Sequence, residues 1–203
     1  MNVLVTGGVG FIGTNLIKRL LKDGHNVVSL DNYSNGTEEN EQEGCVYHQV
    51  DIRDCLDFDF FMDDVDLIYH MAALPRIQPS FEYPEASFRS NIQGTLKVME
   101  WAKEHNVKVI YAGSSSKHHD PADSPYAMSK FLGEEVCKLY KKSYSVNVEI
   151  SRFYNVYGPY ATLDEKFGNV IGIWISQAIK GKPLTIVGDG EQRRDFIHVD
   201  DLV

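Results

Sequence analysis

A glycine-rich turn near the start of the chain constrains the fold more than any other feature. The apolar run at residues 3–5 predicts a strand, and residues 11–22 repeat apolar side chains at helical spacing. Gly7, Gly10 and Gly13 lie at the junction of these two segments. In such a turn the first glycine allows a tight bend, the second lets the backbone approach a pyrophosphate, and the third lets helix and strand pack closely. The free N–H groups that begin the helix would then face the phosphates of a dinucleotide.

An acidic residue follows the second predicted strand, at residues 26–30. Asp31 comes eighteen residues after Gly13, a spacing typical of the acid that binds the adenosine ribose. A carboxylate at this place accepts hydrogen bonds from the ribose hydroxyls and repels a 2′-phosphate. The spacing therefore favours NAD over NADP as the cofactor. The alternative is a glycine turn in an unrelated α/β protein, with Asp31 as a solvated strand end.

Strand and helix patterns alternate through the first three quarters of the chain. Further strands are predicted at residues 46–50, 65–69, 107–111 and 146–152, with helices at 88–105 and 126–144. Residues 32–44 are expected to form a loop or a short helix, and residues 74–80 and 117–125 to form loops. This order predicts an α/β protein with a doubly wound parallel sheet of the Rossmann type. We expect residues 1–157 to form the NAD-binding Rossmann domain. Gly158-Pro159 breaks the pattern, and we expect residues 158–203 to form a partial, small C-terminal substrate lobe with a returning Rossmann segment, which ends early.

The bulk composition excludes several classes of partner. A formal net charge of -9 argues against binding to nucleic acid or to an anionic membrane. No apolar run reaches the roughly 18 residues of a membrane span. The chain opens directly on a strand, so we expect no signal peptide and a cytoplasmic location. Cys45, Cys55 and Cys137 are scattered, and we expect them to be packing residues in a reducing compartment.

A tyrosine and a lysine share one face of the helix predicted at residues 126–144. Tyr126 and Lys130 are four residues apart, and Ser114 lies at the end of the strand that precedes this helix. A free tyrosine has a pKa of about 10 and is a poor base, but a nearby ammonium group favours the phenolate. Strand ends in a doubly wound sheet face the ligand crevice. We therefore expect Ser114, Tyr126 and Lys130 to be catalytic; the alternatives are a surface Tyr-Lys pair and a polar turn of serines.

With these features together, the sequence resembles the extended short-chain dehydrogenase/reductase family. It is most similar to the nucleotide-sugar epimerase/dehydratase branch, of which UDP-glucose 4-epimerase is typical. The resemblance runs from Met1 to the last residue. Its further motifs are Asn35-Gly36, Asp51-Ile52-Arg53, His70-Met71-Ala72-Ala73, Asn91, the segment RFYNVYGP at 152–159, and Gly188-Asp189-Gly190 followed by Arg194-Asp195-Phe196.

The resemblance implies roles for individual residues. Around NAD it places Gly7, Gly10, Phe11, Ile12, Gly13, Asp31, Asn32, Asn35, Gly36, Asp51, Ile52, Ala72, Ala73, Leu74, Asn91, Tyr126, Lys130 and Phe153. Against the substrate it places Ser114, Asn155, Asn169 and Arg194. Arg194 offers the planar donor fork that suits phosphate, although it could also be a solvated arginine beside Arg193, and Asn155 could be merely structural. Arg76, in the loop at 74–80, is a further candidate for contact with the sugar.

The implied activity is 4-epimerisation of a nucleotide-diphosphate sugar, with a UDP-sugar as the first candidate. Tyr126, helped by Ser114, would take the O4 proton while NAD, held tightly, oxidises C4; the 4-keto sugar would rotate and be reduced on its other face. One alternative is a 4,6-dehydratase, whose relatives usually carry an acid where this chain has Ser115 and Ser116. Others are a reductase that releases NADH and a catalytically silent NAD-binding module. The silent module is considered because the chain ends early and because the segment between Ser114 and Tyr126 is shorter than is usual in the family.

The sequence also bears on metals and on assembly. His118 and His119 resemble a metal-binding pair, but no third ligand accompanies them, so we expect no metal and solvent exposure of both. Family members commonly form homodimers through the two long helices, here 88–105 and 126–144. Trp101, Phe131 and Leu139 could form the apolar seam of such a dimer; the alternative is that they are ordinary core residues.

Overall fold

A parallel sheet of six strands forms the centre of the molecule. The computed structural model describes residues 1–54, 61, 63–164 and 168–203. The strands are β1 (Asn2–Thr6), β2 (Asn26–Asp31), β3 (Cys45–Gln49), β4 (Leu67–His70), β5 (Lys108–Ser114) and β6 (Val148–Phe153), in the spatial order β3-β2-β1-β4-β5-β6. The order runs outward from β1 in both directions, so the predicted doubly wound sheet is confirmed. Ligands of such sheets bind at the carboxyl ends of the strands where the order reverses, here between β1 and β4.

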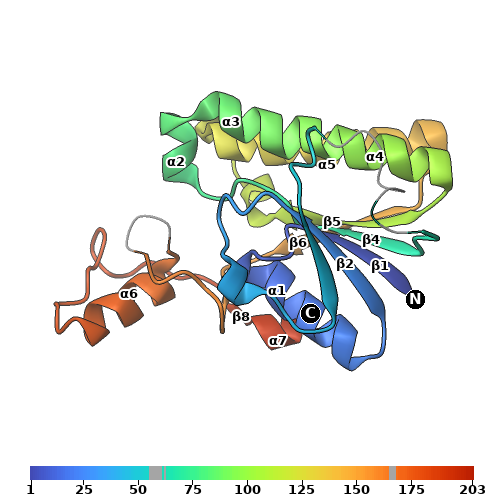
Figure 1. Cartoon of the computed structure of the whole chain (residues 1–203). Helices are drawn as coiled ribbons and strands as arrows, with labels where there is room; N and C mark the ends of the chain where they lie inside the picture. Colours follow the sequence, from blue (N-terminus) through green and yellow to red (C-terminus); the bar gives the residue numbers. More distant parts are fainter. Residues whose placement is uncertain (55–60, 62, 165–167) are drawn as a thin grey trace.

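Helices cover both faces of the sheet (Figure 1). Helix α1 (Phe11–Lys22) lies on one face, and α4 (Gly94–His105) and α5 (Pro125–Tyr144) lie on the other. Strand β1 shows why both faces must be covered: Val3 and Val5 pack in the cluster with α1, whereas Leu4 packs in the cluster with α4 and α5. A strand that is apolar on both sides is typical of a parallel sheet between two helical layers.

The segment before α4 differs from the prediction of a single helix from residue 88. Helix α3 (Pro84–Phe88) begins earlier and runs through a π-helical turn, η2 (Arg89–Gln93), into α4. Within this turn Asn91 is buried, and the Thr95 hydroxyl donates to its carbonyl at 2.7 Å. The preceding segment, expected to be a loop, contains the short helix α2 (Ile77–Glu82), in which the Ser80 hydroxyl donates to the Ile77 carbonyl at 2.6 Å.

The remaining segments connect the sheet to a smaller lobe. Strands β7 (Val156–Tyr157) and β8 (Ile197–His198) pair in parallel, and between them the chain forms α6 (Val170–Ile179), which projects away from the sheet (Figure 1). Helix α7 (Val199–Leu202) returns to α1, and Val203 packs in its cluster. The expected domain division near residue 157 stays a prediction. Short 3-10 turns lie at η1 (Glu38–Asn40), η3 (Ser115–His118) and η4 (Pro121–Asp123).

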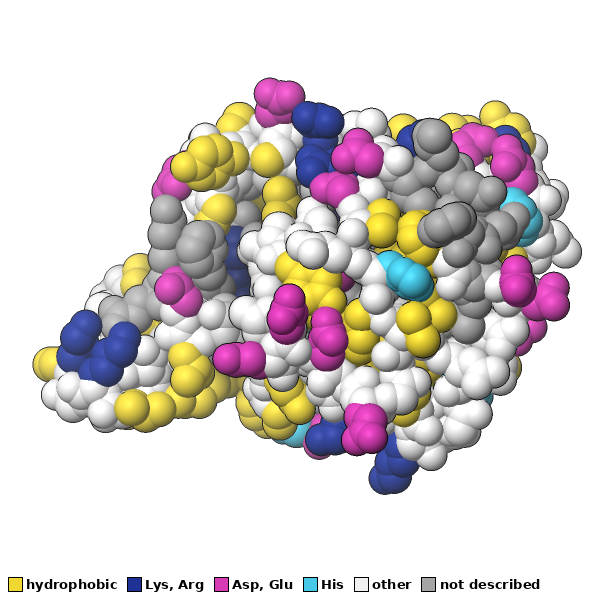
Figure 2. Space-filling view, in the orientation of Figure 1, with side chains coloured by type: hydrophobic (Ala, Val, Ile, Leu, Met, Phe, Trp, Pro, Cys, Tyr) yellow, Lys and Arg dark blue, Asp and Glu magenta, His cyan; other side chains and the backbone are white. Residues whose placement is uncertain are grey.

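The lobe that carries α6 exposes hydrophobic side chains beside basic ones (Figure 2). Ile179, Ile186 and Val187 are each exposed by two thirds or more. In the part of the chain that the structure describes, no helix combines the length and the apolar character needed to cross a membrane. Cys45 and Cys137 are free thiols, the first half-buried and the second buried, and Cys55 lies outside the described residues.

Candidate active site

The glycine turn between β1 and α1 is built as a cradle of main chain. Gly7 has a φ of +78°, and a Cβ added to it would lie 2.7 Å from the backbone nitrogen of Ala72. A Cβ on Gly13 would lie 2.1 Å from the Gly7 carbonyl oxygen. At Gly10, by contrast, an added Cβ would meet nothing closer than that same oxygen at 3.3 Å, so the outer side of the turn is open. These clashes explain why side chains are excluded at positions 7 and 13.

The donor set of this turn fits a phosphate group. Gly10 caps α1 without any side-chain hydrogen bond, and the first turn of α1 holds no acidic residue. The N–H groups that begin the helix are therefore not claimed by a carboxylate, and they carry the positive end of the helix dipole. Asn15 and Thr14 instead bond backward, to Phe11 and Gly10 carbonyls. A pyrophosphate is the ligand that this main-chain arrangement suits.

Asp31 lies directly beside the glycine turn. Its carboxylate accepts hydrogen bonds from the backbone N–H groups of Val9, at 3.1 Å, and Tyr33, at 2.8 Å. Burial raises the pKa of Asp31, and these backbone bonds oppose that rise. A carboxylate oxygen can accept more than one hydrogen bond, so capacity remains for ribose hydroxyls.

The loop after β2 packs against the turn at Val9. A Cβ on Gly36 would lie 2.3 Å from the Val9 carbonyl oxygen, and the Asn40 side chain donates to that oxygen at 2.8 Å. Sequence reasoning missed Asn40, and also Gly8, where a Cβ would overlap the Ser29 side chain. Neither position has a signal of its own in the sequence, because the contact comes from a segment far along the chain.

Asn32 and Asp51 meet at the ends of β2 and β3. The Asn32 amide donates to the Asp51 carboxylate at 2.9 Å, and the hydrogen bonds of the Arg53 guanidinium hold the pKa of Asp51 well below its usual range. Ile52 is buried, and its side chain contacts Gly94 in α4 rather than lying open. Asn35 is exposed in the loop after β2. The structure thus brings Asn32 and Asp51 together.

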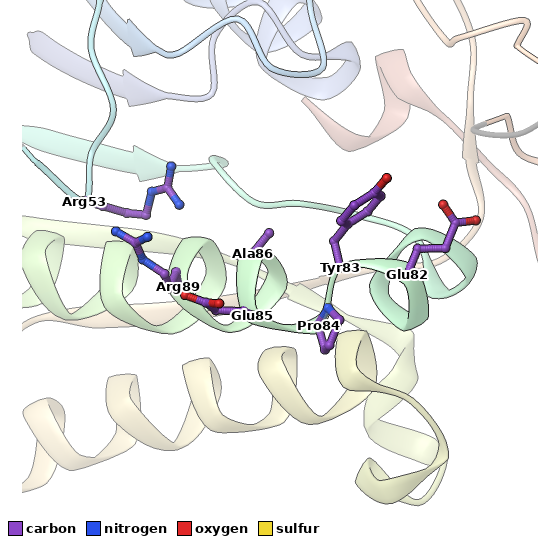
Figure 3. Close-up of a pocket in the computed structure, with 7 residues that line it drawn as sticks. All are labelled: Arg53, Glu82, Tyr83, Pro84, Glu85, Ala86 and Arg89. Atoms are coloured by element: carbon purple, nitrogen blue, oxygen red, sulfur yellow. The ribbon is translucent and has the colours of Figure 1, made fainter.

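A separate cavity lies beside helix α3. It has a volume of about 510 Å³ and opens between the segment after β3 and helix α3. In Figure 3, Arg53 and Arg89 lie at one end of it and Tyr83 and Glu82 at the other. Neither Ser114 nor Tyr126 lines it, so we place the candidate chemistry by the strand ends and not by this cavity.

Asn91 fixes the loop that follows β4. Its side-chain oxygen accepts from the Leu74 N–H at 2.8 Å, and its amide hydrogens go to the Leu74 carbonyl at 3.1 Å and the Ser129 hydroxyl at 2.9 Å. Both amide hydrogens are therefore used inside the protein. Ala72 is held similarly, because its N–H donates to the Thr6 hydroxyl at 3.2 Å. Asn91 positions the loop, and its direct contact with the cofactor stays a prediction.

His70 is locked in a neutral form at the end of β4. The Thr95 hydroxyl gives its single hydrogen to the Asn91 carbonyl, so His70 Nε2, 3.0 Å away, must donate to Thr95. The other nitrogen, Nδ1, then accepts from Thr6 Oγ1 at 2.7 Å. Burial lowers the pKa of His70 to about 3. His70 is therefore a structural link between β1, β4 and α4.

Ser114 and Tyr126 meet at the carboxyl end of β5. The Tyr126 hydroxyl donates to Ser114 Oγ at 3.4 Å, a long hydrogen bond, and Ser114 Oγ also accepts from the Ser116 N–H at 3.1 Å. Ser114 is buried and Tyr126 is half-buried. Burial raises the pKa of the Tyr126 phenol, while the Ser114 hydrogen bond and the positive charge of Arg76 lower it. A hydroxyl pair at this strand end can exchange a proton with a substrate oxygen.

Lys130 is buried on the same helix but does not bond to Tyr126. Its ammonium group donates to the Ala112 carbonyl at 2.5 Å and lies 4.5 Å from the centre of the Tyr111 ring. Burial lowers the pKa of Lys130 to about 8. The sequence predicted that the Lys130 ammonium group lies beside the Tyr126 phenol. In the structure this ammonium group donates its hydrogen bond to the Ala112 carbonyl of β5.

The remaining predicted substrate residues lie toward the small lobe. Asn155, with a φ of +38°, donates to the Asp195 carbonyl at 2.8 Å, and Asn169 caps α6 by accepting from the Gly172 N–H. Arg194 is exposed and donates to the carbonyl of Arg193. Among the described residues, none of these three bonds to Ser114 or Tyr126.

Two predicted residues near the end of β6 have different surroundings. Phe153 lines a small cavity of about 50 Å³ together with Ile12 and Leu16 of α1. The Arg152 side chain, in the same motif, forms an ion pair with the buried Glu134 of α5 at 2.7 Å and so ties β6 to that helix. The Arg152–Glu134 pair had no signal in the sequence beyond the motif itself.

The histidines after β5 differ from each other in their contacts. His118 and His119 are both exposed, and His118 Nε2 lies 2.7 Å from the Tyr154 hydroxyl. Over the described ranges, no group of three histidine, cysteine or acidic side chains has the arrangement of a metal site. His118 therefore connects η3 to the end of β6.

The chain is similar to known proteins over its whole length. The model of the NAD dependent epimerase/dehydratase family matches residues 3–203. The chain is 33% identical to an uncharacterized UDP-glucose epimerase of Bacillus subtilis, over 100% of this chain and 70% of that protein. It is 31% identical to UDP-glucuronic acid decarboxylase 1 of Xenopus tropicalis, over 99% of this chain and 51% of that protein.

A solved structure agrees with the sequence matches. UDP-glucuronic acid 4-epimerase from Bacillus cereus, in complex with UDP-glucuronic acid and NAD, superposes with a TM-score of 0.89 at 31% identity and covers 100% of this chain and 70% of that one. The likeness thus includes the whole described fold. The chain therefore belongs to the NAD-dependent epimerase/dehydratase branch of the extended short-chain dehydrogenases/reductases, a family of enzymes that use NAD.

Proposed function

We propose that this protein is a 4-epimerase of nucleotide-diphosphate sugars. The observation that carries the proposal is the Ser114–Tyr126 hydroxyl pair at the carboxyl end of β5. Relatives named as a UDP-glucose epimerase and a UDP-glucuronic acid 4-epimerase support it. A UDP-sugar is accordingly the proposed substrate.

The chain's residues would share the work as follows. When bound, NAD supplies reversible acceptance of a hydride from C4 of the sugar. Tyr126, as the phenolate, accepts the proton of the O4 hydroxyl, and Ser114 donates a hydrogen bond to that oxygen. The same two groups return the proton after the sugar has turned over.

The cofactor would be held by the residues that the sequence singled out near the sheet. Gly7, Gly10 and Gly13 leave the main chain open to the pyrophosphate, and Asp31 offers its carboxylate to the ribose. The other members of the proposed NAD site are Phe11, Ile12, Asn32, Asn35, Gly36, Asp51, Ile52, Ala72, Ala73, Leu74, Asn91, Tyr126, Lys130 and Phe153. Arg194, Asn155 and Asn169 are proposed to contact the diphosphate or the sugar from the small lobe.

Two competing reactions begin with the same oxidation at C4. A 4,6-dehydratase needs an acid at the end of β5, where Ser115 and Ser116 carry only hydroxyls. A decarboxylase is suggested by the relative from Xenopus tropicalis and requires a uronic acid as substrate. The hydroxyl pair without a neighbouring acid favours epimerisation over dehydration.

The test is a product analysis with three substrates. The full chain, supplied with NAD, is incubated separately with UDP-glucose, UDP-galactose and UDP-glucuronic acid, and the products are separated by anion-exchange chromatography. A 4-epimer without release of carbon dioxide is expected, whereas a 4-keto-6-deoxy sugar or a pentose would overturn the proposal. Tyr126→Phe is expected to abolish turnover while NAD binding, measured by isothermal titration, is retained.

We further propose a homodimer through α4 and α5. Phe131 and Leu139 on α5 and Leu96 on α4 are exposed by 38–53% although they are apolar. Trp101, expected to contribute to this seam, is only 6% exposed and packs in the core instead. A single monomer peak in light scattering would contradict the dimer.

A further inference from the structure

The loop between β4 and α2 is clamped to the helix that carries Tyr126. At its start, Leu74 is bonded through both backbone groups to the Asn91 side chain, which also bonds Ser129 of α5. At its other end, Ser80 Oγ accepts from the N–H of Tyr126 itself at 3.0 Å. The loop is therefore held by hydrogen bonds on both sides of residue 76, and one of them joins it to the backbone of Tyr126.

Arg76 occupies the middle of this clamp in a strained conformation. Its φ of +99° lies in a region that residues with a Cβ rarely adopt. Such strain persists where surrounding structure enforces it, and it is typical of functional positions. Here the clamp through Leu74 and Ser80 supplies that enforcement.

The guanidinium of Arg76 has no counter-ion in the described part of the chain. The side chain is half-buried, and no hydrogen bond or ion pair joins it to a described residue. Burial lowers the pKa of Arg76, which marks a charge held without the usual compensation by an acid. The two groups influence each other electrostatically: the Tyr126 phenol raises the pKa of Arg76, and the charge of Arg76 lowers the pKa of Tyr126.

The other basic group near the phenol is engaged elsewhere. Lys130 donates to the Ala112 carbonyl at 2.5 Å and stacks over the Tyr111 ring. Tyr111 itself is buried on β5 and is uncharged, because burial raises its pKa. The ionisable side chains on the short helices and turns against the first half of α5 are exposed: Glu82, Glu85, Arg89, Lys117, His118 and Asp123.

We propose that Arg76 is the electrostatic partner of Tyr126, a positioning residue that stabilises the phenolate form, a role that the Tyr-Lys pattern assigns to Lys130. The expected effect on kcat rests on the proposed function, whereas the expected effect on the ionisation of Tyr126 does not. A fixed positive charge beside the phenol favours loss of the phenolic proton, so more of the enzyme is in the basic form near neutral pH. Lys130 uses one of its three hydrogens on the Ala112 carbonyl and has others for its proposed contact with the nicotinamide ribose.

Three substitutions separate the charge of Arg76 from the strain of its backbone. Arg76→Lys keeps the charge, and Arg76→Gln removes it while both keep a Cβ. Arg76→Gly removes the charge and also relieves the left-handed conformation, so this variant is expected to unfold at a temperature no lower than that of the wild type. Loss of activity in Arg76→Gly therefore cannot be attributed to a failure to fold.

The first measurement is the pH dependence of kcat and KM with the UDP-sugar that the wild type converts. Near neutral pH we expect kcat to fall about tenfold in Arg76→Gln and Arg76→Gly, with little change in KM, and the deficit to shrink as the pH rises. Arg76→Lys should stay within about threefold of the wild type. An unchanged pH profile with a raised KM would overturn the proposal, because it would make Arg76 a ligand of the substrate.

The second measurement needs no turnover. Ionisation of Tyr126 is followed by the ultraviolet absorbance of tyrosinate in the substrate-free protein, with Tyr126→Phe subtracted in each Arg76 background. We expect the Tyr126 transition to move to higher pH in Arg76→Gln and to stay in place in Arg76→Lys. If the wild type converts no UDP-sugar, the proposed function fails and this titration alone decides; identical transitions in wild type and Arg76→Gln would overturn the role of Arg76.

Discussion

Removal of the Asn91 side chain tests whether the clamp on the 74–80 loop is a stabilising part of the fold. Asn91 is 1% exposed and makes three side-chain hydrogen bonds, two with Leu74 and one with Ser129. At about 1 kcal/mol net for each bond, Asn91→Ala should lower the free energy of unfolding by about 3 kcal/mol. This corresponds to a roughly hundredfold larger unfolding constant.

Urea denaturation followed by circular dichroism measures this loss directly. With a slope of about 2–3 kcal/mol/M, the midpoint should fall by about 1 M while the slope is unchanged. Asn91→Asp should be no better than alanine, because the Ser129 hydroxyl already gives its hydrogen to the Tyr126 carbonyl and cannot donate to a carboxylate. Asn147→Ala is the matched control, since Asn147 is exposed and its side chain bonds to none of the described residues. A midpoint for Asn91→Ala within about 0.3 M of this control would refute the reasoning.

Three other perturbations follow from the site and its support. Gly13→Ala should weaken NAD binding at least about tenfold in isothermal titration, since the new Cβ would lie 2.1 Å from the Gly7 carbonyl oxygen and the turn must shift; wild-type affinity would contradict the close packing. Glu134→Gln leaves the Arg152 guanidinium without its counter-charge and should cost about 2 kcal/mol, seen as a lower melting temperature. Burial lowers the pKa of His70 to about 3, so below about pH 6.5 the unfolded chain takes up a proton that the folded chain refuses, and stability should fall by up to about 1.4 kcal/mol per pH unit. In His70→Gln the free energy of unfolding should fall less steeply as the pH is lowered. Equal dependence on pH in the wild type and the variant would show that the histidine does not titrate on unfolding.

The fold class and the cofactor class were within reach of the sequence because their signals are local. The bend at Gly7, the close packing at Gly13 and the helix that follows are properties of consecutive residues, and the structure places them as expected. The helix predicted at residues 126–144 differs from α5 only by the proline that begins it. Apolar strands with helices between them leave few topologies other than a doubly wound sheet.

Local patterns carry no information on contacts that join distant segments. The spacing of Tyr126 and Lys130 correctly placed both on one helix, but spacing carries no information about the hydrogen-bond acceptors on β5. The acceptor of the Lys130 ammonium group is the Ala112 carbonyl, which belongs to strand β5 and not to the helix that carries Tyr126 and Lys130. Likewise, the partners of the buried Asn91 side chain are Leu74 in the loop after β4 and Ser129 on α5.

By itself, then, the sequence determined the order of strands and helices, the main-chain cradle for a dinucleotide, the acid beside it and the tyrosine at the strand end. These depend on backbone conformation, apolar periodicity and the rule that parallel strands end at a common edge. Only the tertiary structure decided which cation acts on that tyrosine. Asn91 and Ser80 fix the loop of Arg76 against α5, and a charge acts through space on whatever group the fold brings near it.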